Sequence, residues 1–338
     1  MSSNELLQGF FALLSGGALA LGLYLKNNPE LRPDKRWGTV VTPWLLPLFL
    51  ILLLVMLPIT GAGNSLPMLG AMCLGIFLHM SVYYVLLIAV GPLLRRWISA
   101  GACAVLWLLP NFLYICQHRL MRRSAPKWII WLQGEWLRSA VLVWLAGVAA
   151  ILLWKCIEHL LFRRKLLDSA WPERDGVINE TWTDMQRNAK IKKADIPLLR
   201  SREVVSPMSV GLFRSSTFVV LPETEYTVEE LELILRHELI HIIRRDAQTK
   251  MFLTFCTAVC WFNPLMWVAI RRCAEDLELS CDELVLENAD GTEKNRYANL
   301  ILRCAGESRG FTSNLAPTTA SLRYRLKQIM SPGRRLTG

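Results

Sequence analysis

Five apolar runs, each about as long as a helix that crosses a bilayer, constrain the fold of this chain more than any other feature. They occupy residues 6–25, 43–60, 68–94, 98–116 and 139–157. A helix needs about 20 apolar residues to cross the hydrocarbon core of a membrane. The chain is 53% hydrophobic over 338 residues, which is too apolar for a soluble globular protein. We therefore predict a mainly α-helical, polytopic membrane protein.

Positively charged residues predict how these runs are oriented, because Lys and Arg are enriched in cytoplasmic loops. Such residues follow the first run at 26–36, the third at Arg95-Arg96 and the fifth at Arg163-Arg164-Lys165. Five spans then place the amino terminus outside and the residues after the fifth run in the cytoplasm. The basic loop at 117–138 conflicts with this topology. A re-entrant fourth run would remove the conflict, but it would place the later residues outside.

The net charge of +10 has a similar explanation. A basic chain can bind nucleic acid, but such proteins carry a basic recognition helix or a module that combines aromatic and basic residues. The sequence contains neither, and basic loops beside membrane spans account for the charge. We therefore expect contact with the lipid bilayer and no direct nucleic acid binding.

The most specific chemical signature is His237-Glu238-Leu239-Ile240-His241, which reads H-E-x-x-H. Thr227 and Glu230 form a T-x-x-E capping box, which predicts a helix that begins near Val228 and continues through the motif. Histidines four residues apart on a helix share one face and can hold one metal ion, while the glutamate between them can accept a proton from water. We interpret the motif as a zinc-hydrolase site and not as a chance match on an amphipathic helix.

A catalytic zinc ion usually has three protein ligands and one water. Acidic candidates for the third ligand follow at Glu275, Glu278 and Asp282, on one face of a second helix. The apolar residues 251–270 between the two sites are interrupted at Asn263-Pro264. A single membrane crossing would separate Glu278 from the histidines. We therefore predict a helical hairpin that dips into the membrane and turns at Asn263-Pro264.

The remaining segments predict a mixed soluble part. A polar helix is expected over 182–193, with strands at 203–205 and 217–221 and a turn and strand over 207–216 between them. Strands before an H-E-x-x-H helix can align a peptide substrate by strand addition, although a purely structural hairpin is an equal alternative. Residues 292–308 and 319–330 read as amphipathic, basic helices that would cover the active site, contact lipid headgroups or dock a partner.

These stretches resemble the membrane zinc metallopeptidases of the BlaR/MecR type, which include bacterial β-lactam sensor-transducers. Order and spacing agree over about residues 195–300 for the H-E-x-x-H motif and for Val210-Gly211-Leu212-Phe213, Phe218-Val219-Val220-Leu221-Pro222, Arg244-Arg245-Asp246, Trp261-Phe262-Asn263-Pro264-Leu265 and Glu278-Leu279-Ser280-Cys281-Asp282. The resemblance implies a gluzincin, in which His237, His241 and Glu278 hold Zn²⁺ and Glu238 is the general base. The family's E-x-x-x-D pattern, here Glu278 and Asp282, supplies the third ligand.

The resemblance also implies a bacterial inner-membrane protein whose active site faces the cytoplasm and cuts a protein substrate. A transcriptional repressor or a membrane-associated regulator is the expected substrate. Asp246 and Asp282 are candidates for orienting the histidine rings, although Asp246 could instead pair with Arg244 or Arg245. Cys281 is taken as a packing residue. The sequence ends at Gly338, so we expect no C-terminal extracellular sensor domain.

We divide the chain into three parts. Residues 1–158 form a membrane domain of about five transmembrane helices, 159–290 a zinc metalloprotease domain with a small β-hairpin or sheet and a re-entrant hairpin at 251–275, and 291–338 a cytoplasmic helical C-terminal segment. The leading hypothesis is a zinc-dependent endopeptidase in regulatory proteolysis. The alternative is a non-catalytic zinc-binding signalling or scaffold protein, which would not need Glu238. No oxyanion-stabilising residue can be assigned, and Tyr297 and Tyr324 are only guesses.

Overall fold

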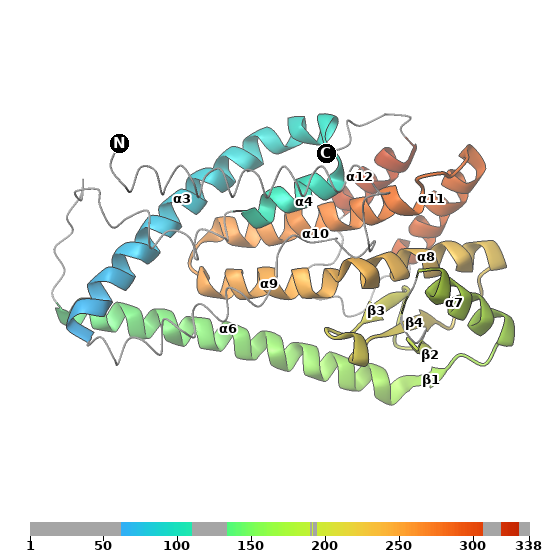
Figure 1. Cartoon of the computed structure of the whole chain (residues 1–338), viewed down its shortest axis with the longest axis horizontal. Coiled ribbons are helices and arrows are strands. Elements are labelled where there is room, and N and C mark those ends of the chain that lie inside the picture. Colours follow the sequence, from blue (N-terminus) through green and yellow to red (C-terminus); the bar gives the residue numbers. More distant parts are fainter. Residues whose placement is uncertain (1–61, 110–133, 190, 192–194, 307–318, 331–338) are drawn as a thin grey trace. The chain divides into compact units, whose positions relative to one another are not determined.

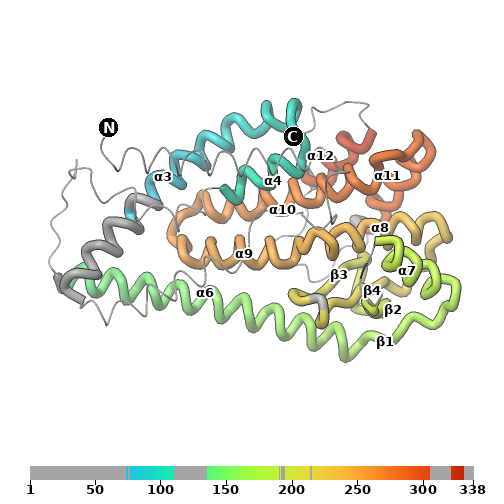
Figure 2. The backbone as a smooth tube through the Cα atoms, in the orientation of Figure 1, coloured from blue at the N-terminus to red at the C-terminus, as the bar shows by residue number. Residues whose placement is uncertain are grey.

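The computed structural model describes residues 62–109, 134–189, 191, 195–306 and 319–330 (Figure 1). In chain order its elements are helices α3 (Ala62–Trp97), α4 (Ala100–Leu108) and α6 (Gly134–Ser169), strand β1 (Ala170–Pro172), helix α7 (Gly176–Asn188), strands β2 (Leu198–Ser201) and β3 (Met208–Val210), the 3₁₀ helix η3 (Arg214–Ser216), strand β4 (Phe218–Pro222), and helices α8 (Val228–Arg244), α9 (Asp246–Val259), α10 (Pro264–Val285), α11 (Gly291–Gly306) and α12 (Thr319–Met330). Figure 2 traces this path. The predicted apolar runs at 6–25 and 43–60 lie outside the described residues.

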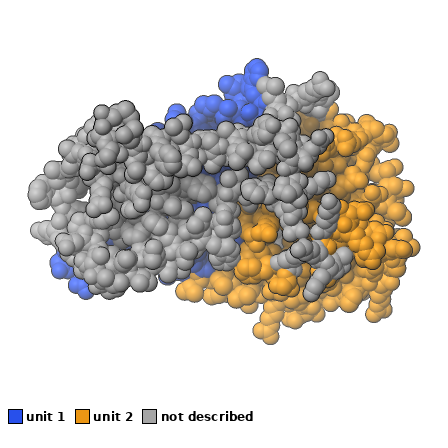
Figure 3. Space-filling view, viewed as in Figure 1, with its two compact units in different colours: residues 1–152, 251–273, 335–338 blue, residues 153–250, 274–334 orange. Residues whose placement is uncertain are grey.

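The chain forms two compact units (Figure 3). One consists of residues 1–152, 251–273 and 335–338, and the other of 153–250 and 274–334. These boundaries differ from the predicted division into a membrane domain, a protease domain and a C-terminal segment. The chain passes from one unit to the other within α6, α9 and α10. The functional assignment of the predicted parts therefore stays a prediction.

Two helices in the described residues are long and apolar enough to cross a membrane, judged by length and composition. They are Phe77–Trp97 within α3 and Glu135–Ser169, which makes up almost all of α6. No residue in the most apolar window of α6 is buried, whereas the core helix of a soluble protein would be mostly buried. The third and fifth predicted runs coincide with these helices. Within the described residues, the fourth run forms only the short helix α4.

The chain turns between α9 and α10 at the predicted position. Pro264 is the first residue of α10, where its missing N–H removes no helical hydrogen bond. The side-chain oxygen of Asn263 accepts the backbone N–H of Leu265 at 3.0 Å, which caps the new helix. The indole N–H of Trp144 on α6 donates to the carbonyl of Val259 at 2.7 Å and ties the turn to α6. The helical hairpin is present, and its insertion into a membrane stays a prediction.

The second unit is built on a small sheet with the strand order β1-β2-β4-β3. β2 pairs with β4 in parallel, and the two outer pairs are antiparallel. Every residue of β4 is buried, because both of its faces are covered. Val219 and Leu221 pack with residues of α7 and α8, while Phe218 and Val220 pack with Leu166 near the end of α6. The predicted strand at 217–221 is confirmed as β4, and β3 forms the sheet edge that contacts α8.

The predicted strand at 203–205 is wrong. The strand in this region is β2, which ends at Ser201. The Ser201 hydroxyl accepts the backbone N–H of Glu203 at 3.2 Å, and this local hydrogen bond turns the chain away from the sheet. Val204 is nevertheless buried, in the cluster beneath β4. The hydrophobic side chain of Val204 is buried although the residue lies in a loop and is not paired in a strand.

Helix α7 begins six residues before its predicted start at 182. The Asp175 carboxylate caps it by accepting the backbone N–H groups of Val177 and Ile178 at 2.9 and 3.4 Å. An aspartate at this position is a standard helix start signal, and it places the first residue of α7 at Gly176. The helices predicted at 292–308 and 319–330 are confirmed as α11 and α12.

Gly211 occupies a backbone conformation that other residues rarely adopt, with a φ of +135° directly after β3. A Cβ added there would lie 2.5 Å from the Cα of Thr217 and 2.6 Å from the carbonyl oxygen of Ser216. We expect Gly211→Ala to destabilise the fold by about 1–3 kcal/mol and to lower the melting temperature of the full chain in detergent. Gly176→Ala is the matched control, because nothing lies within 4 Å of its added Cβ. Equal melting temperatures for the two variants would contradict this assignment.

Candidate metal centre

Helix α8 places the two histidines of the motif side by side. It begins at Val228 as predicted, and the capping box is complete: Thr227 accepts the N–H of Glu230, whose carboxylate accepts the N–H of Thr227. The apolar stripe of α8 packs into the core that contains β4. The opposite side carries His237 and His241, and their Nε2 atoms lie 3.1 Å apart.

Glu278 of α10 completes a triad with these nitrogens. Its Oε2 atom lies 3.6 Å from the Nε2 of His237 and 3.6 Å from the Nε2 of His241. Zinc binds histidine and carboxylate at about 2.0–2.2 Å, so a tetrahedral site has ligand–ligand edges of about 3.3–3.6 Å. The two separations of 3.6 Å that involve Glu278 fall within this range, and the 3.1 Å separation of the two imidazole nitrogens is slightly shorter. The donor atoms and their spacing therefore fit one face of a zinc coordination tetrahedron.

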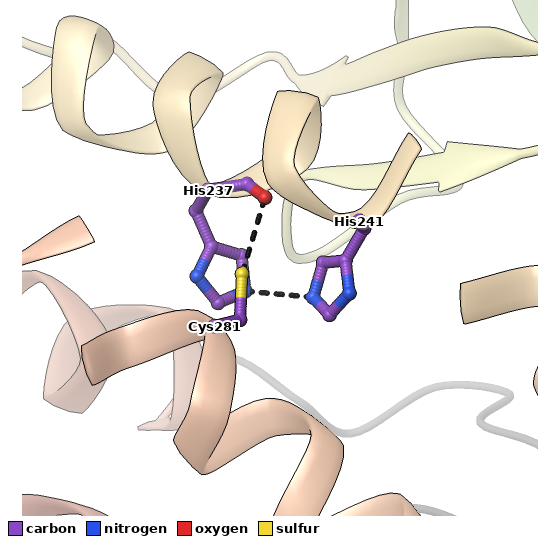
Figure 4. Close-up of side chains that lie close together, drawn as sticks. All are labelled: His237, His241 and Cys281. Atoms are coloured by element: carbon purple, nitrogen blue, oxygen red, sulfur yellow. Dashed lines mark hydrogen bonds between the residues drawn. The ribbon is translucent and has the colours of Figure 1, made fainter. Parts of the chain in front are cut away.

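Cys281 is a further donor at this position (Figure 4). Its sulfur and the ring nitrogens of His237 and His241 all lie within 4.8 Å of one another. The thiol is fully buried and donates to the backbone carbonyl of His237 at 3.3 Å. Sequence reasoning treated Cys281 as a packing residue. Its spacing of three residues from Glu278, on the same side of a helix, was the signal that could have identified it.

Asp246 lies behind the His241 ring. Arg245 ends α8 in the left-handed conformation, with a φ of 59°, and α9 begins at the next residue. This sharp change of direction brings the Asp246 carboxylate to 2.7 Å from His241 Nδ1, on the side of the ring away from Glu278. Arg244 pairs with the same carboxylate at 2.6 Å. The two predicted alternatives for Asp246, histidine partner and salt bridge, are thus present together.

A second hydrogen-bond chain lies behind His237. The Tyr297 hydroxyl of α11 donates to Asp282 at 2.8 Å and lies 2.8 Å from His237 Nδ1. With its single proton directed to Asp282, the hydroxyl oxygen is placed to accept from Nδ1–H, so that Nε2 is the ring nitrogen that faces Glu278. Arg325 of α12 donates two hydrogen bonds to Asp282, both 2.8 Å. The Tyr297 hydroxyl therefore contacts the Nδ1 side of the His237 ring.

Three carboxylates of the centre each have a cationic partner. Asp246 pairs with Arg244, Asp282 with Arg325, and Glu278 with Lys250. The Lys250 ammonium lies 3.2 Å from Oε1 of Glu278, so Oε2 remains directed toward the two imidazoles. Pairing of this kind is required when several charged groups are buried together.

The electrostatics favour positive charge between the imidazoles and Glu278. Burial by itself lowers the pKa of His237, but the charge of Cys281 and hydrogen bonds to Cys281 and Glu278 raise that pKa to about 10. Burial by itself raises the pKa of Glu278, but the charges of His241 and Lys250 hold it well below its usual value. A divalent cation supplies the same positive charge and displaces the protons, because metal ligands must be deprotonated.

Glu238 belongs to the same charged cluster. It follows His237 on α8 and is only 6% exposed. Burial lowers the pKa of Lys250, but the negative charges of Glu278, Asp246 and Glu238 raise it above its usual value. The Glu238 carboxylate therefore contributes to the negative charge acting on Lys250, the residue that binds Oε1 of Glu278.

Together, a histidine pair on α8, a carboxylate on α10 and a small sheet whose edge contacts α8 form a candidate metal centre of the kind found in metallopeptidases. A family model described as BlaR1 peptidase M56 matches residues 129–329, more than half of the chain. This protein therefore belongs to the M56 family of metallopeptidases. The match includes all the residues of the candidate metal centre.

Curated relatives agree with this family. The chain is 27% identical over 188 residues to the regulatory protein BlaR1 of Bacillus licheniformis, a match that covers 54% of this chain and 30% of the relative. It is 26% identical over 170 residues to the methicillin resistance mecR1 protein of Staphylococcus aureus, covering 49% of this chain and 28% of the relative. The matches thus span less than a third of each relative's length.

Tyr297 provides a test of the hydrogen-bond chain behind His237. Tyr297→Phe removes the oxygen that accepts from His237 Nδ1–H, and we expect Zn²⁺ to bind about 10- to 100-fold more weakly. The measurement is the zinc dissociation constant of the detergent-solubilised chain in competition with a chelator. Tyr226→Phe removes a hydroxyl from a tyrosine outside the centre and serves as the control. Unchanged zinc affinity in Tyr297→Phe would show that the hydroxyl does not orient the ring.

Proposed function

We propose that this chain is a membrane-embedded, zinc-dependent endopeptidase that acts in regulatory proteolysis. The observation that carries this proposal is the triad of His237, His241 and Glu278, whose metal-facing atoms lie 3.1–3.6 Å apart. Glu238 lies next to this triad in the sequence and in the charged cluster. Membership of a metallopeptidase family supports the same conclusion.

The residues have distinct roles in this proposal. His237, His241 and Glu278 hold Zn²⁺, which when bound lowers the pKa of water and polarises a carbonyl group. Glu238 accepts a proton from the water that adds to the scissile carbonyl carbon. It then transfers this proton to the leaving nitrogen as the C–N bond breaks. Asp246 and Tyr297 hold the histidine rings so that their Nε2 atoms face the metal.

The edge strand β3 is a candidate platform for the substrate. β3 pairs with β4 on one side only and contacts α8, which carries Glu238. An extended peptide can add to such an edge through backbone hydrogen bonds. A segment of the substrate protein paired with Met208–Val210 would lie alongside α8. The expected substrate is a transcriptional repressor or a membrane-associated regulator.

The described helices support membrane insertion. α6 has 36 residues, which corresponds to about 54 Å at 1.5 Å per residue and exceeds the roughly 30 Å hydrocarbon core. Its exposed side chains include Leu142, Val143, Leu153 and Trp154, which are stable in contact with lipid but unfavourable in water. The basic residues 163–165 near its end favour a cytoplasmic location for the metal centre, in the inner membrane of a bacterium.

A second candidate function follows from Cys281. If its thiolate joined the three other ligands, the metal would have four protein ligands and no open position, as in structural zinc sites. The protein would then be a zinc-binding signalling or scaffold protein without peptidase activity. The presence of Glu238, which a purely structural site does not need, favours the open, catalytic arrangement.

Glu238→Gln tests the catalytic proposal. The variant keeps the shape of the side chain but cannot accept a proton, so we expect cleavage to fall by about 10²- to 10⁴-fold while zinc content is unchanged. The measurement is self-cleavage, or cleavage of a co-expressed regulator encoded by a neighbouring gene, followed by gel and mass spectrometry. Glu232→Gln is the control on the same helix, at an exposed carboxylate that pairs with Arg236. Equal cleavage by wild type and Glu238→Gln would favour the scaffold.

The ligand set is tested by two substitutions on α10. We expect Glu278→Ala to lose stoichiometric zinc, because two neutral histidines without a negatively charged ligand bind the metal only weakly. We expect Cys281→Ser to retain zinc, because the thiol is not required in the open arrangement. The measurement is zinc content after dialysis against a weak chelator. Zinc retained by Glu278→Ala and lost by Cys281→Ser would identify the His-His-Cys set as the true site.

A further inference from the structure

Helix α12 belongs to the second unit and places an arginine, Arg325, at the candidate metal centre. Ser321, Arg325 and Ile329 are spaced four residues apart and therefore lie on one side of the helix. Ser321 and Ile329 are buried, and Ile329 belongs to the same core cluster as the apolar stripe of α8. The Arg325 side chain is only 13% exposed. A charged residue thus occupies the middle of the face by which α12 docks.

The guanidinium of Arg325 reaches two acidic residues of α10, Asp282 and Glu278. Its Nε and Nη2 atoms each donate to Asp282 at 2.8 Å, which is the strong two-pronged geometry of an arginine–carboxylate pair. Its Nη1 lies 3.8 Å from Oε2 of Glu278, the oxygen directed toward the histidines. Asp282 in turn accepts the hydroxyl of Tyr297, which contacts His237. A continuous chain of polar contacts therefore runs from α12 to a candidate metal ligand.

Stability alone does not explain this arrangement. A buried ion pair contributes little net stability, because desolvation of both charges offsets their attraction, and an apolar pair of similar volume is often as stable. α12 already has an apolar anchor in Ile329 and Leu326. Arg325 additionally fixes the orientation of the groups that surround Asp282. Its planar fork fixes the carboxylate, and the carboxylate fixes the Tyr297 proton.

We propose that Arg325 is a positioning residue through which docking of the C-terminal helix α12 controls the metal centre. This inference rests on the proposed metal site and assigns its control to a helix that supplies none of the ligands. When α12 is docked, Arg325 holds Asp282, Asp282 holds Tyr297, and His237 presents Nε2 to the metal. When α12 leaves, the series of hydrogen bonds behind His237 loses Arg325, its outermost member. Metal binding then weakens. A partner that captures α12 would therefore lower peptidase activity.

Thermodynamic reciprocity provides a test that a purely structural arginine would fail. If docking of α12 raises metal affinity, metal binding must favour docking of α12 to the same extent. We expect Zn²⁺, added to the metal-depleted full chain in detergent, to slow hydrogen exchange of the backbone amides of residues 321–329. We expect Arg325→Met to bind zinc about 10- to 100-fold more weakly and to lose this effect of zinc on α12. The visible spectrum of the Co²⁺-loaded protein should also change in this variant, since it reports ligand geometry.

Two further variants distinguish a positioning role of Arg325 from an effect of its charge alone and from a general effect on folding. Arg323→Met removes an exposed arginine from the same helix, and we expect the zinc affinity of wild type. Arg325→Lys keeps the charge without the fork and should bind zinc with intermediate affinity. Wild-type zinc affinity in Arg325→Met, equal losses in Arg325→Met and Arg323→Met, or no effect of zinc on α12 in the wild type would each overturn the proposal. If Arg325→Met does not fold, the wild-type exchange measurement and Arg325→Lys still decide.

These readouts do not depend on the proposed peptidase activity. Zinc affinity and exchange of α12 are measured without a substrate. A chain that shows the expected coupling but cleaves nothing, with Glu238→Gln behaving like wild type, would retain the role of Arg325 and lose the peptidase function. A chain that depends on Glu238 for cleavage but shows no coupling would retain the peptidase and lose the role of Arg325.

Discussion

The approach of two imidazoles on α8 to a carboxylate on α10 is the interaction on which the rest of the centre depends. Three polar groups with their reactive atoms 3.1–3.6 Å apart, largely removed from water, require a cation between them or protons on the rings. The surrounding charges satisfy this requirement. Each carboxylate has its own cation, and both histidines have an Nδ1 contact that leaves Nε2 for the metal.

The centre draws on five consecutive helices, α8 to α12, and each contributes a different group of residues. α8 supplies the histidines and Glu238, the turn into α9 supplies Asp246, and α10 supplies Glu278, Cys281 and Asp282. α11 and α12 supply Tyr297 and Arg325, which contact His237 and Glu278, two of the proposed metal ligands. The ligands therefore come from the middle of the domain, whereas their orientation depends on helices at its C-terminal end.

Local sequence signals predicted the helices well and the strands poorly. The capping box at Thr227 and Glu230 identified the first residue of α8, and Asn263-Pro264 identified the turn between α9 and α10, because both signals act through hydrogen bonds within a few residues. β2 was misplaced, since strand pairing with β4 joins residues about twenty positions apart. Val204 had the composition of a strand residue, yet it fills the core from a turn.

The sequence by itself determined the class of chemistry, because the H-E-x-x-H spacing places both histidines on one side of any helix that contains it. It also indicated Glu278, through a spacing that this family shares. Only the tertiary structure decided which groups stand behind the ligands. Tyr297 and Arg325 lie 60 and 88 positions beyond His237, and no local pattern marks them. Their roles depend on how α11 and α12 pack against α8 and α10, a question settled by burial of apolar side chains across the whole domain.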